Sequence, residues 1–599
     1  HVAISAGQHR GASFAVVIAA TSNGDVYAIN AAKSCDVAPG RILWRTHLGE
    51  PCRLQPAPLD GVPTGILATP VIDTARGRIY VTHCDPENRW QAYALELGSG
   101  AIVPGWPVRL DEESFNGLNR NAGPERVPPK RRFDFRVQRG ALNLSPDGNA
   151  LYVVFGETET GWLVAVDTQA AKLRSAFAAV AMPHRGSGGI WGAGGAAVDA
   201  QGHVYVATGS GFDGYKEQPH DWTQSVLKLA LGPQGFELRG TYTPFNHCIT
   251  AKNDIDLGSG GVMLPPDLPA GTTSTPHLLA VGGKQGNAYL LDREHLPGRL
   301  DQRPACTTDA SSDTSLLPPQ TQPQFGTRGP LSVFGPYSEQ DAALDLARAR
   351  SVPASFRDAD GHAYLYFTGN SKRAQGSADS VPPSIARLRI EAAPGRPAYL
   401  RLDRTNKKLA FGNPGSPVVT SNGPRDAIVW ILDENAPRSA LLAGSDAPRP
   451  VLYALDGGTL DVLWRSAPGE LPTSGKYNEA AFGGGLVFVG TDRIQAFGVG
   501  GTRKENRHAS EAAAALPQPA PAARDVAGLD AKAIYGQRCA MCHDHPQGNI
   551  PARAWLATLP RDRIAAALTT GVMRAQATGL NAEQIGELAR FLKEDGPRP

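Results

Sequence analysis

The sequence predicts an all-β, eight-bladed propeller followed by a small all-α domain. Three observations lead to this fold class. Short apolar strands joined by turns recur along the first 499 residues, the 599-residue chain is rich in turn formers with 67 glycines and 49 prolines, and its last part has the apolar spacing of helices. We expect a propeller over residues 1–499, a linker over residues 500–528 and a helical domain over residues 529–599.

The propeller is predicted from a repeated unit in which an apolar strand, a turn and a second apolar strand ending in Asp or Asn follow one another. The second strand is clearest at residues 25–30, 162–167, 288–292 and 451–456. About eight units can be counted, at residues 14–49, 65–110, 136–180, 188–244, 256–298, 350–405, 413–466 and 476–499. Repeated four-stranded sheets arranged radially form a propeller, so eight blades are expected, with seven or nine as alternatives.

Three segments interrupt this regularity. Residues 299–349 are a long insertion, expected to lie on a face of the propeller as loops. The last unit is short, and the N-terminal strand is expected to complete it. Residues 500–528 are rich in Ala, Pro and charge, which is typical of a flexible-to-extended linker.

Composition restricts the classes of function. A chain of 599 residues is too long for one ordinary core. With 59 Lys and Arg against 57 Asp and Glu, the net charge of +2 gives no indication of a nucleic acid or a membrane surface as partner. No run of 18 apolar residues predicts a spanning helix. The chain begins at His1 rather than Met, which fits a processed or truncated product.

The strongest chemical motif is Cys-Ala-Met-Cys-His at residues 539–543. Cys-x-x-Cys-His is the attachment signature of c-type haem: Cys539 and Cys542 would form the thioethers, and His543 would be the proximal iron ligand. A zinc site or a redox Cys pair are the alternatives. Zinc would require further ligands at suitable spacing, and only His545 follows the motif.

A second axial ligand is indicated by the four methionines of the chain, because Met541 lies inside the attachment loop and Met573 follows His543 by 30 residues. Residues 581–584 (Asn-Ala-Glu-Gln) then begin a final helix in the manner of a capping box, with residues 585, 588, 589 and 592 on its apolar face. This layout resembles a small class I cytochrome c over residues 529–596. The resemblance implies ligation by His543 and Met573; Met573 as plain core filler is the alternative.

The repeats, with their Tyr-Ala-Leu-Asp and Leu-Trp endings, resemble the propellers that bind pyrroloquinoline quinone (PQQ), over most of residues 10–499. PQQ alcohol dehydrogenases have a catalytic Asp followed about 28 residues later by Arg or Lys. Here Lys284 follows Asp256 by 28 residues and precedes Tyr-Leu-Leu-Asp-Arg at 289–293. The resemblance implies that Asp256 takes the proton of a substrate hydroxyl and that Lys284 stabilises charge on the quinone oxygen. A turn-capping Asp and a solvated Lys are the alternative.

The same resemblance implies further cofactor contacts. Trp191, between glycines at 188–195, corresponds to the Trp on which the quinone stacks. Arg139 is a candidate for holding a PQQ carboxylate. Each could equally pack between blades.

The resemblance also implies a calcium or lanthanide ion beside the quinone. Glu157 or Glu159 and Asp256 are the candidate ligands. Ser210 stands where the family has an Asn ligand, which is a departure from the calcium pattern. Asp254 and Asp256 form an Asp-x-Asp pair like that of the lanthanide-dependent members, so Asp254 could be the base and Asp256 the ligand.

Outside the haem motif the chain has five cysteines, at positions 35, 52, 84, 248 and 306, so at most two disulfides form among them. Cys35–Cys52 and Cys248–Cys306 are candidate pairings. No Cys-Cys dipeptide is present, whereas the alcohol dehydrogenases have one near the quinone. The chain is therefore more similar to the polyvinyl-alcohol-dehydrogenase-like quinohaemoproteins.

These features predict a periplasmic quinohaemoprotein dehydrogenase that oxidises a small-molecule or polymeric alcohol at PQQ and passes electrons to haem c. The electron acceptor would be a periplasmic cytochrome, a copper protein or an oxidase, and residues 111–135 and 299–349 would form substrate walls. The alternative is a cofactor-free propeller that serves as a binding scaffold with a tethered electron-transfer cytochrome c.

Overall fold

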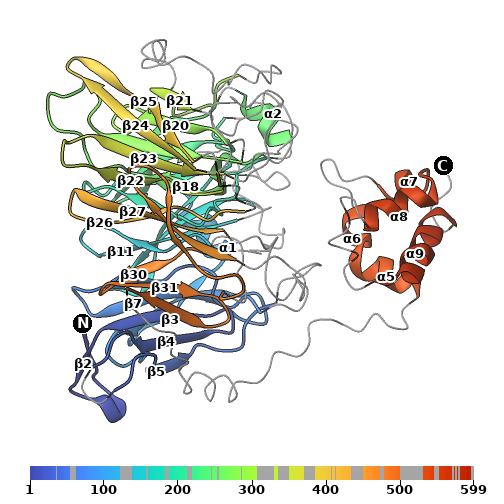
Figure 1. Ribbon diagram of the computed structural model, residues 1–599, viewed down its shortest axis with the longest axis horizontal. Helices are drawn as coiled ribbons and strands as arrows, with labels where there is room; N and C mark the ends of the chain where they lie inside the picture. The colour runs from blue at the N-terminus through green and yellow to red at the C-terminus, as the bar shows by residue number, and fades with distance from the viewer. Residues whose placement is uncertain are drawn as a thin grey trace. The chain divides into compact units, whose positions relative to one another are not determined.

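A computed structural model of the chain has two kinds of structure, a strand-rich body and a small group of C-terminal helices (Figure 1). The residues that it describes are 1–34, 37–53, 63–121, 138–156, 160–181, 188–211, 219–244, 246–252, 255–284, 286–305, 330–334, 350–369, 385–406, 408–409, 411, 413–433, 450–471, 478–499, 530–544, 552–569, 573, 577 and 580–594.

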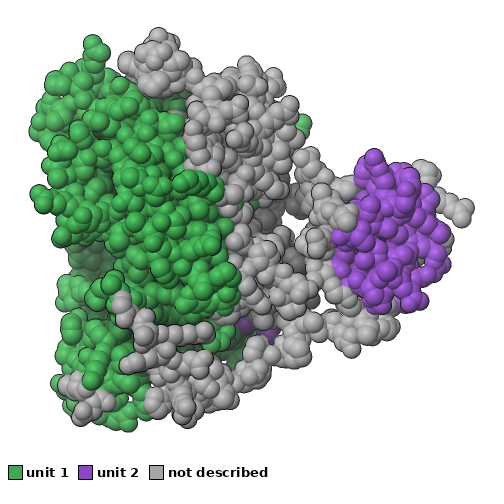
Figure 2. Space-filling model, viewed as in Figure 1, with its two compact units in different colours: residues 1–52, 64–439, 448–509 green, residues 53–63, 440–447, 510–599 purple. Residues whose placement is uncertain are grey.

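The chain divides into two compact units, which Figure 2 colours separately. The strand-rich unit comprises residues 1–52, 64–439 and 448–509, and the other contains residues 510–599 together with 53–63 and 440–447. The linker predicted at 500–528 lies outside the described residues.

The described part of the strand-rich unit contains eight successive antiparallel sheets of three or four strands, the blades of an eight-bladed propeller. We number the blades 1 to 8 in chain order. Blades 1 to 4 consist of β3 (Val16–Ala20), β4 (Asp25–Asn30) and β5 (Ile42–His47); β6 (Val71–Asp73), β7 (Arg78–Cys84), β8 (Trp90–Glu96) and β9 (Val108–Leu110); β10 (Asn143–Leu144), β11 (Ala150–Phe155), β12 (Trp162–Asp167) and β13 (Lys172–Ala178); and β14 (Ala197–Val198), β15 (Val204–Ala207), β16 (Val226–Gly232) and β17 (Gly235–Tyr242).

Blades 5 to 8 continue the pattern, and the predicted fold class is confirmed. They consist of β18 (Gly261–Met263), β19 (Leu278–Gly282), β20 (Ala288–Asp292) and β21 (Ser332–Phe334); β22 (Ala354–Arg357), β23 (Ala363–Thr368), β24 (Ile385–Ala393) and β25 (Arg396–Thr405); β26 (Val418–Asn422), β27 (Arg425–Asp433), β28 (Val451–Asp456) and β29 (Val462–Arg465); and β30 (Ala481–Gly483), β31 (Leu486–Gly490) and β32 (Ile494–Gly498).

Two details differ from the sequence-based expectation. The segment 299–349 is not only an insertion, because it contains β21, which pairs with β20 as the fourth strand of blade 5. The N-terminal strand β1 (Val2–Ala3) pairs with β2 (Ser13–Phe14) and not with the short last blade. Ile4 and Phe14 pack with Ala28 and Leu43, so this hairpin covers blade 1.

Apolar side chains fill the space between adjacent blades. Between blades 2 and 3, Trp90, Phe155 and Trp162 surround Phe115 of the short helix α1 (Glu112–Leu118), with ring centroids 5.5 and 5.6 Å from Phe115 to Phe155 and Trp162. Every residue of β11 is buried, as expected for a strand covered on both faces.

Backbone hydrogen bonds also join neighbouring blades where their first strands begin. Ala141 N donates to Ala193 O at 3.0 Å, linking blades 3 and 4, and Gly194 N donates to Gly260 O at 3.1 Å, linking blades 4 and 5. The approach is close enough that a Cβ on Gly192 would lie 2.5 Å from Gly260 O, so a side chain is excluded there. This end of the blades is therefore held tightly together.

One disulfide is resolved between described cysteines, Cys52–Cys84, with a Cα–Cα distance of 5.3 Å. The candidate pairing of Cys35 with Cys52 is therefore wrong. Cys52 N donates to Cys84 O at 2.8 Å, which brings the end of β7 beside the chain that leads into blade 2. Cys248 is also disulfide-bonded, and its predicted partner Cys306 lies outside the described residues, as does Cys35.

Removing this disulfide is expected to destabilise the propeller. Cys52 and Cys84 are 32 residues apart, and a bond that closes a loop of that length contributes roughly 3–4 kcal/mol through the unfolded chain. The Cys52→Ala/Cys84→Ala variant should lose about that much free energy of unfolding in guanidinium denaturation followed by tryptophan fluorescence. A loss below about 1 kcal/mol would contradict this expectation.

The C-terminal unit is a small helical domain, as predicted. Its described helices are α5 (Ala531–Arg538), α6 (Ala540–His543), α7 (Arg553–Leu556), α8 (Arg561–Thr569) and α9 (Ala582–Glu594). The predicted capping box is present, since Gln584 N donates to Asn581 Oδ1 at 2.8 Å and Asn581 N to Gln584 Oε1 at 3.1 Å. The predicted apolar face of α9 is buried against Ile534 of α5 and Leu568 of α8.

Among the described helices, none is long and apolar enough to cross a membrane.

Candidate functional site

Four of the predicted site residues lie where strands of blades 3, 4 and 5 begin or end. Arg139, Trp191 and Asp256 precede β10, β14 and β18, the first strands of these blades, and Lys284 follows β19, the second strand of blade 5. The first two strands of a blade are antiparallel, with Gly261 opposite Gly282 in blade 5. The start of the first strand and the end of the second therefore share one edge, and the four residues meet there.

Asp256 and Lys284 form a buried ion pair. Lys284 Nζ lies 2.5 Å from Asp256 Oδ2, and Ser210 N donates to Asp256 Oδ1 at 2.7 Å. Burial by itself would raise the pKa of Asp256, but the charge of Lys284, with hydrogen bonds from Lys284 and Ser210, outweighs it and holds that pKa below its usual range. Asp256 is therefore ionised at neutral pH.

Trp191 forms an aromatic wall beside this pair. Lys284 Nζ lies 5.3 Å from the centroid of the indole, and Arg139 Cζ lies 5.2 Å from it. Arg139 is held in place because its Nε donates to Trp191 O at 3.0 Å. A Cβ on Gly209 would lie 2.9 Å from Asp256 Oδ1 and 3.0 Å from Trp191 Nε1, so the turn fits only a glycine. Asp256, Lys284, Trp191 and Arg139 thus converge on one site.

This donor set suits a planar anion. An indole offers a stacking surface, and two cations lie beside it, which matches the flat rings and carboxylates of PQQ. The convergence was the outcome that distinguishes the enzyme hypothesis from residues scattered over the outsides of blades. It leaves the roles of the four residues as a proposal.

The described residues do not form a cage for a calcium or lanthanide ion at this site. Each carboxylate oxygen of Asp256 faces a nitrogen donor, Ser210 N or Lys284 Nζ. The other predicted ligands, Glu157, Glu159 and Asp254, lie outside the described residues. The metal assignment therefore remains a sequence-based prediction, and no chemistry is derived from it here.

A cluster of metal-ligand side chains occurs elsewhere, at Asp358, Asp360 and His362 in the turn between β22 and β23. Asp358 Oδ1 accepts hydrogen bonds from the backbone N–H groups of Asp360 and His362 at 3.1 and 2.8 Å. In blade 4, Asp199 Oδ1 accepts in the same way from His203 N at 2.9 Å. The cluster is therefore a hairpin cap that recurs between blades.

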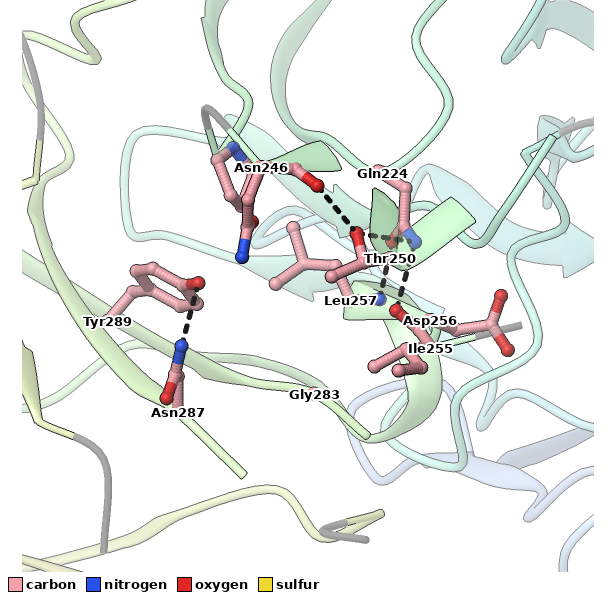
Figure 3. Close-up of a pocket in the computed structure, with 10 residues that line it drawn as sticks. Gln224, Asn246, Thr250, Ile255, Asp256, Leu257, Gly283, Asn287 and Tyr289 are labelled. Carbon is pink, nitrogen blue, oxygen red and sulfur yellow. Dashed lines mark hydrogen bonds between the residues drawn. The ribbon is translucent and has the colours of Figure 1, made fainter. Parts of the chain in front are cut away.

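A small pocket lies beside Asp256, on the side away from its carboxylate (Figure 3). Asn287 and Tyr289 of blade 5 line one side, joined by a hydrogen bond from Asn287 Nδ2 to Tyr289 Oη at 3.2 Å. Gln224 and Thr250 line the other side, next to the backbone around Asp256. None of these four residues was predicted, because no spacing or motif in the sequence identifies them.

Glu479, which precedes the first strand of blade 8, is a second unpredicted acidic residue at a blade entrance. Ser416 N donates to Glu479 Oε1 at 3.3 Å, and Ser416 Oγ accepts from Val352 N at 3.0 Å, so the carboxyl group joins a chain of contacts between blades. Burial raises the pKa of Glu479 above its usual range, more than these hydrogen bonds lower it.

A raised pKa in the folded state means that ionisation of Glu479 opposes folding. The stability that this carboxyl contributes is present below its unfolded pKa and is lost as the pH rises through the folded pKa. We expect Glu479→Gln, which keeps the acceptor for Ser416, to have a higher melting temperature than the parent at pH 8 and an equal one at pH 4.5. The exposed Glu113→Gln is the control. Equal melting temperatures of Glu479→Gln and the parent at both pH values would contradict the expectation.

In the C-terminal unit, the Cys-x-x-Cys-His motif forms the start of the structure around a helical core. Cys539 caps α6, the backbone of Cys542 is part of it, and His543 N donates to Cys539 O at 3.0 Å. Cys539 and His543 are buried, and Met573 packs against the core that contains Cys539. Two thiols, an imidazole and a thioether in one small core are the donor set that a covalently attached haem requires.

The unit is of the cytochrome c type. Residues 527–592 match the family model described as cytochrome c oxidase, cbb3-type, subunit III. The predicted recognition of a propeller joined to a C-terminal cytochrome c domain is thus confirmed.

A curated relative is the polyvinylalcohol dehydrogenase of Sphingopyxis sp. strain 113P3, 40% identical over 62 residues. This match spans 10% of the present chain and 10% of the relative. Among solved structures, the quinohemoprotein alcohol dehydrogenase of Comamonas testosteroni aligns with a TM-score of 0.47 and 15% identity over 98% of this chain and 88% of its own. The quinohemoprotein alcohol dehydrogenase ADHIIG of Pseudomonas putida HK5 aligns with a TM-score of 0.49 and 15% identity, over 96% and 87%.

Proposed function

We propose that the protein is a periplasmic quinohaemoprotein dehydrogenase that oxidises an alcohol at PQQ and passes the electrons to haem c. The observation that carries the proposal is the meeting of Asp256, Lys284, Trp191 and Arg139 at one edge of blades 3 to 5, in a chain that ends in a cytochrome c domain. The relatives named above are oxidoreductases of this kind by their descriptions. The alcohol is either a small molecule or a polymer.

In this proposal the propeller residues divide the work. Trp191 stacks on the quinone, and Arg139 holds one of its carboxylates. PQQ, when bound, supplies an electron-poor quinone carbon that accepts a hydride. Asp256, ionised through its pairing with Lys284, accepts the proton of the substrate hydroxyl at a carboxylate oxygen, and Lys284 places its positive charge beside the quinone oxygen. Asp254 remains the alternative base.

In the C-terminal unit, Cys539 and Cys542 would attach the haem, and His543 and Met573 would be its axial ligands. Haem c, when bound, supplies a one-electron carrier. A haem with both axial positions occupied transfers electrons and binds no substrate, so the domain serves as the electron exit toward a periplasmic cytochrome, a copper protein or an oxidase.

Met573 as an axial ligand gives a specific expectation. Thioether ligation opposite His raises the reduction potential of haem, so Met573→Ala should have a clearly lower midpoint potential than the parent in a spectroelectrochemical titration. Met263→Ala, which removes a methionine from β18, is the matched control and should leave the potential unchanged. An unchanged potential in Met573→Ala would identify Met573 as core filler.

A second candidate function has one observation in its favour. The charges of Asp256 and Lys284 satisfy each other, and Ser210 N completes the set, so the ion pair needs no ligand to be stable. A propeller held together in this way could be a binding scaffold without PQQ, with the cytochrome domain serving a bound partner.

Binding of PQQ separates the two candidates. The purified protein is titrated with PQQ in the presence of EDTA, Ca²⁺ or La³⁺, and quenching of tryptophan fluorescence is followed. The dehydrogenase predicts saturable binding of one PQQ per chain, weakened at least tenfold in Arg139→Ala and unaffected in Arg78→Ala, a substitution in β7. No saturable binding under any of the three conditions would reject the dehydrogenase and favour the scaffold.

A further inference from the structure

The carboxamide of Gln224 is hydrogen-bonded to both peptide groups that flank Asp256. Gln224 Nε2 donates to Ile255 O at 2.9 Å, and Leu257 N donates to Gln224 Oε1 at 2.7 Å. A side chain that pairs with both neighbours of a residue in this way imitates an adjacent strand. It fixes the backbone of Asp256, which is extended with φ −66° and ψ 129°, and with it the direction of the carboxylate.

Gln224 is itself held rigidly. It is 1% exposed, its N donates to Gly209 O at 2.8 Å, and its backbone has φ +52°, a left-handed conformation that non-glycine residues rarely adopt. Such a conformation costs of the order of 1 kcal/mol or more and persists where surrounding contacts determine it. Because Gly209 also touches Asp256 and Trp191, Gln224 is joined to the site through both its backbone and its side chain.

Two more contacts connect Gln224 with the surroundings of Asp256. Its Nε2 lies 3.2 Å from Thr250 Oγ1 and 3.3 Å from Ser210 Oγ. Thr250 belongs to the short helix α2 (His247–Lys252), which precedes Asp256 in the chain (Figure 3). Ser210 is the residue whose N–H is hydrogen-bonded to Asp256 Oδ1. The carboxamide therefore connects blade 4 to the segment that carries Asp256.

We infer that Gln224 is a positioning residue, which holds the Asp256 carboxylate against Ser210 N and Lys284 Nζ and in the direction required for proton transfer. The catalytic part of this inference rests on the proposed function; the structural part does not. A displacement of about 1 Å in a reacting group can cost on the order of 100-fold in rate, so a residue that only fixes a backbone can have a large effect on turnover.

The structural part is tested by hydrogen exchange at the Leu257 amide, in protein without PQQ. Gln224→Met keeps the length of the side chain and removes both hydrogen bonds, and Gln224→Glu keeps the acceptor for Leu257 N and removes the donor. We expect exchange at Leu257 to be at least tenfold faster in Gln224→Met and near the parent rate in Gln224→Glu. Parent-like protection in Gln224→Met would overturn the inference, whatever the activity.

Asn406→Ala is the matched control for losing a buried carboxamide. Asn406 Nδ2 donates to Leu460 O at 2.7 Å, and its Oδ1 accepts from Lys408 N at 2.7 Å, in another part of the propeller. This variant should leave the exchange of Leu257 unchanged. Faster exchange there in Asn406→Ala would attribute the effect to general loosening and would count against Gln224.

The catalytic part is tested in the PQQ-loaded protein. We expect Gln224→Met to lower kcat for alcohol-dependent haem reduction by about 10- to 100-fold, while KM and the Kd for PQQ change less than about twofold. A parallel rise of KM or Kd would contradict positioning of the base. If the parent binds no PQQ, the proposed function fails, and the exchange experiment alone decides whether Gln224 holds the Asp256 segment. If the parent turns over and Gln224→Met keeps its kcat, the catalytic part is overturned.

Discussion

Replacing Asp256 with asparagine is expected to lower the rate of alcohol-dependent haem reduction by about 100- to 10,000-fold, the range that a positioned general base contributes. The amide cannot accept the hydroxyl proton, although it has nearly the same shape. PQQ should still bind, because Trp191 and Arg139 are unchanged. The measurement is single-turnover reduction of haem in PQQ-loaded protein, alongside the fluorescence titration.

Loss of a buried charge complicates this variant, because Lys284 would remain without its partner. Breaking a buried ion pair on one side destabilises proteins by about 3–5 kcal/mol, whereas replacing both partners is often nearly neutral. Asp256→Asn/Lys284→Met should therefore recover most of the lost free energy of unfolding without recovering activity. The capping residue Asp358→Asn is the control and should stay active. Activity in Asp256→Asn within threefold of the parent would exclude Asp256 as the base and leave Asp254 as the remaining candidate.

Removal of both motif cysteines should have the second largest effect. Cys539→Ser/Cys542→Ser is expected to carry no covalently bound haem, because serine forms no thioether with the vinyl groups. Alcohol oxidation measured with the native electron acceptor should fall to background. Oxidation measured with a small dye that takes electrons directly from the propeller site should persist.

The readouts for this variant are covalent haem content after denaturation and the two acceptor assays. His545→Ala is the matched control, since His545 is the residue that a zinc site would need, and it should keep its haem. Full haem content in the double cysteine variant, or zinc in place of haem in the parent, would contradict the assignment. Loss of activity with both acceptors would mean that the propeller site depends on the cytochrome domain for more than electron transfer.

Much of the propeller could be predicted because each blade carries its own local pattern. The apolar run at residues 162–167 and the turn before it specify a buried strand whatever the rest of the chain does, and the structure has β12 there. The strand β21 was missed because it has three residues and follows a long insertion, so no periodicity marks it. The Cys52–Cys84 bond was missed because pairing depends on which strand ends meet, which local patterns do not encode.

The candidate site was predictable only in part for the same reason. Asp256 and Lys284 were found by their spacing, and their ion pair is consistent with that choice. Gln224 is 32 residues from Asp256 in the chain, in a segment with no motif, and its importance depends on hydrogen bonds that exist only when blades 4 and 5 are packed together. Glu479 likewise gains its buried environment only through the neighbouring blade.

The central claim is that alcohol oxidation at the propeller reduces the haem of the same chain. The most direct test is to load the oxidised protein with PQQ, with Ca²⁺ or La³⁺ present, add a panel of small alcohols and a polymeric alcohol without any external acceptor, and follow the haem α-band. The account predicts haem reduction with at least one alcohol, at a rate independent of protein concentration and only when PQQ is supplied. A haem that stays oxidised with every alcohol despite bound PQQ, or that is reduced equally without PQQ, would contradict it.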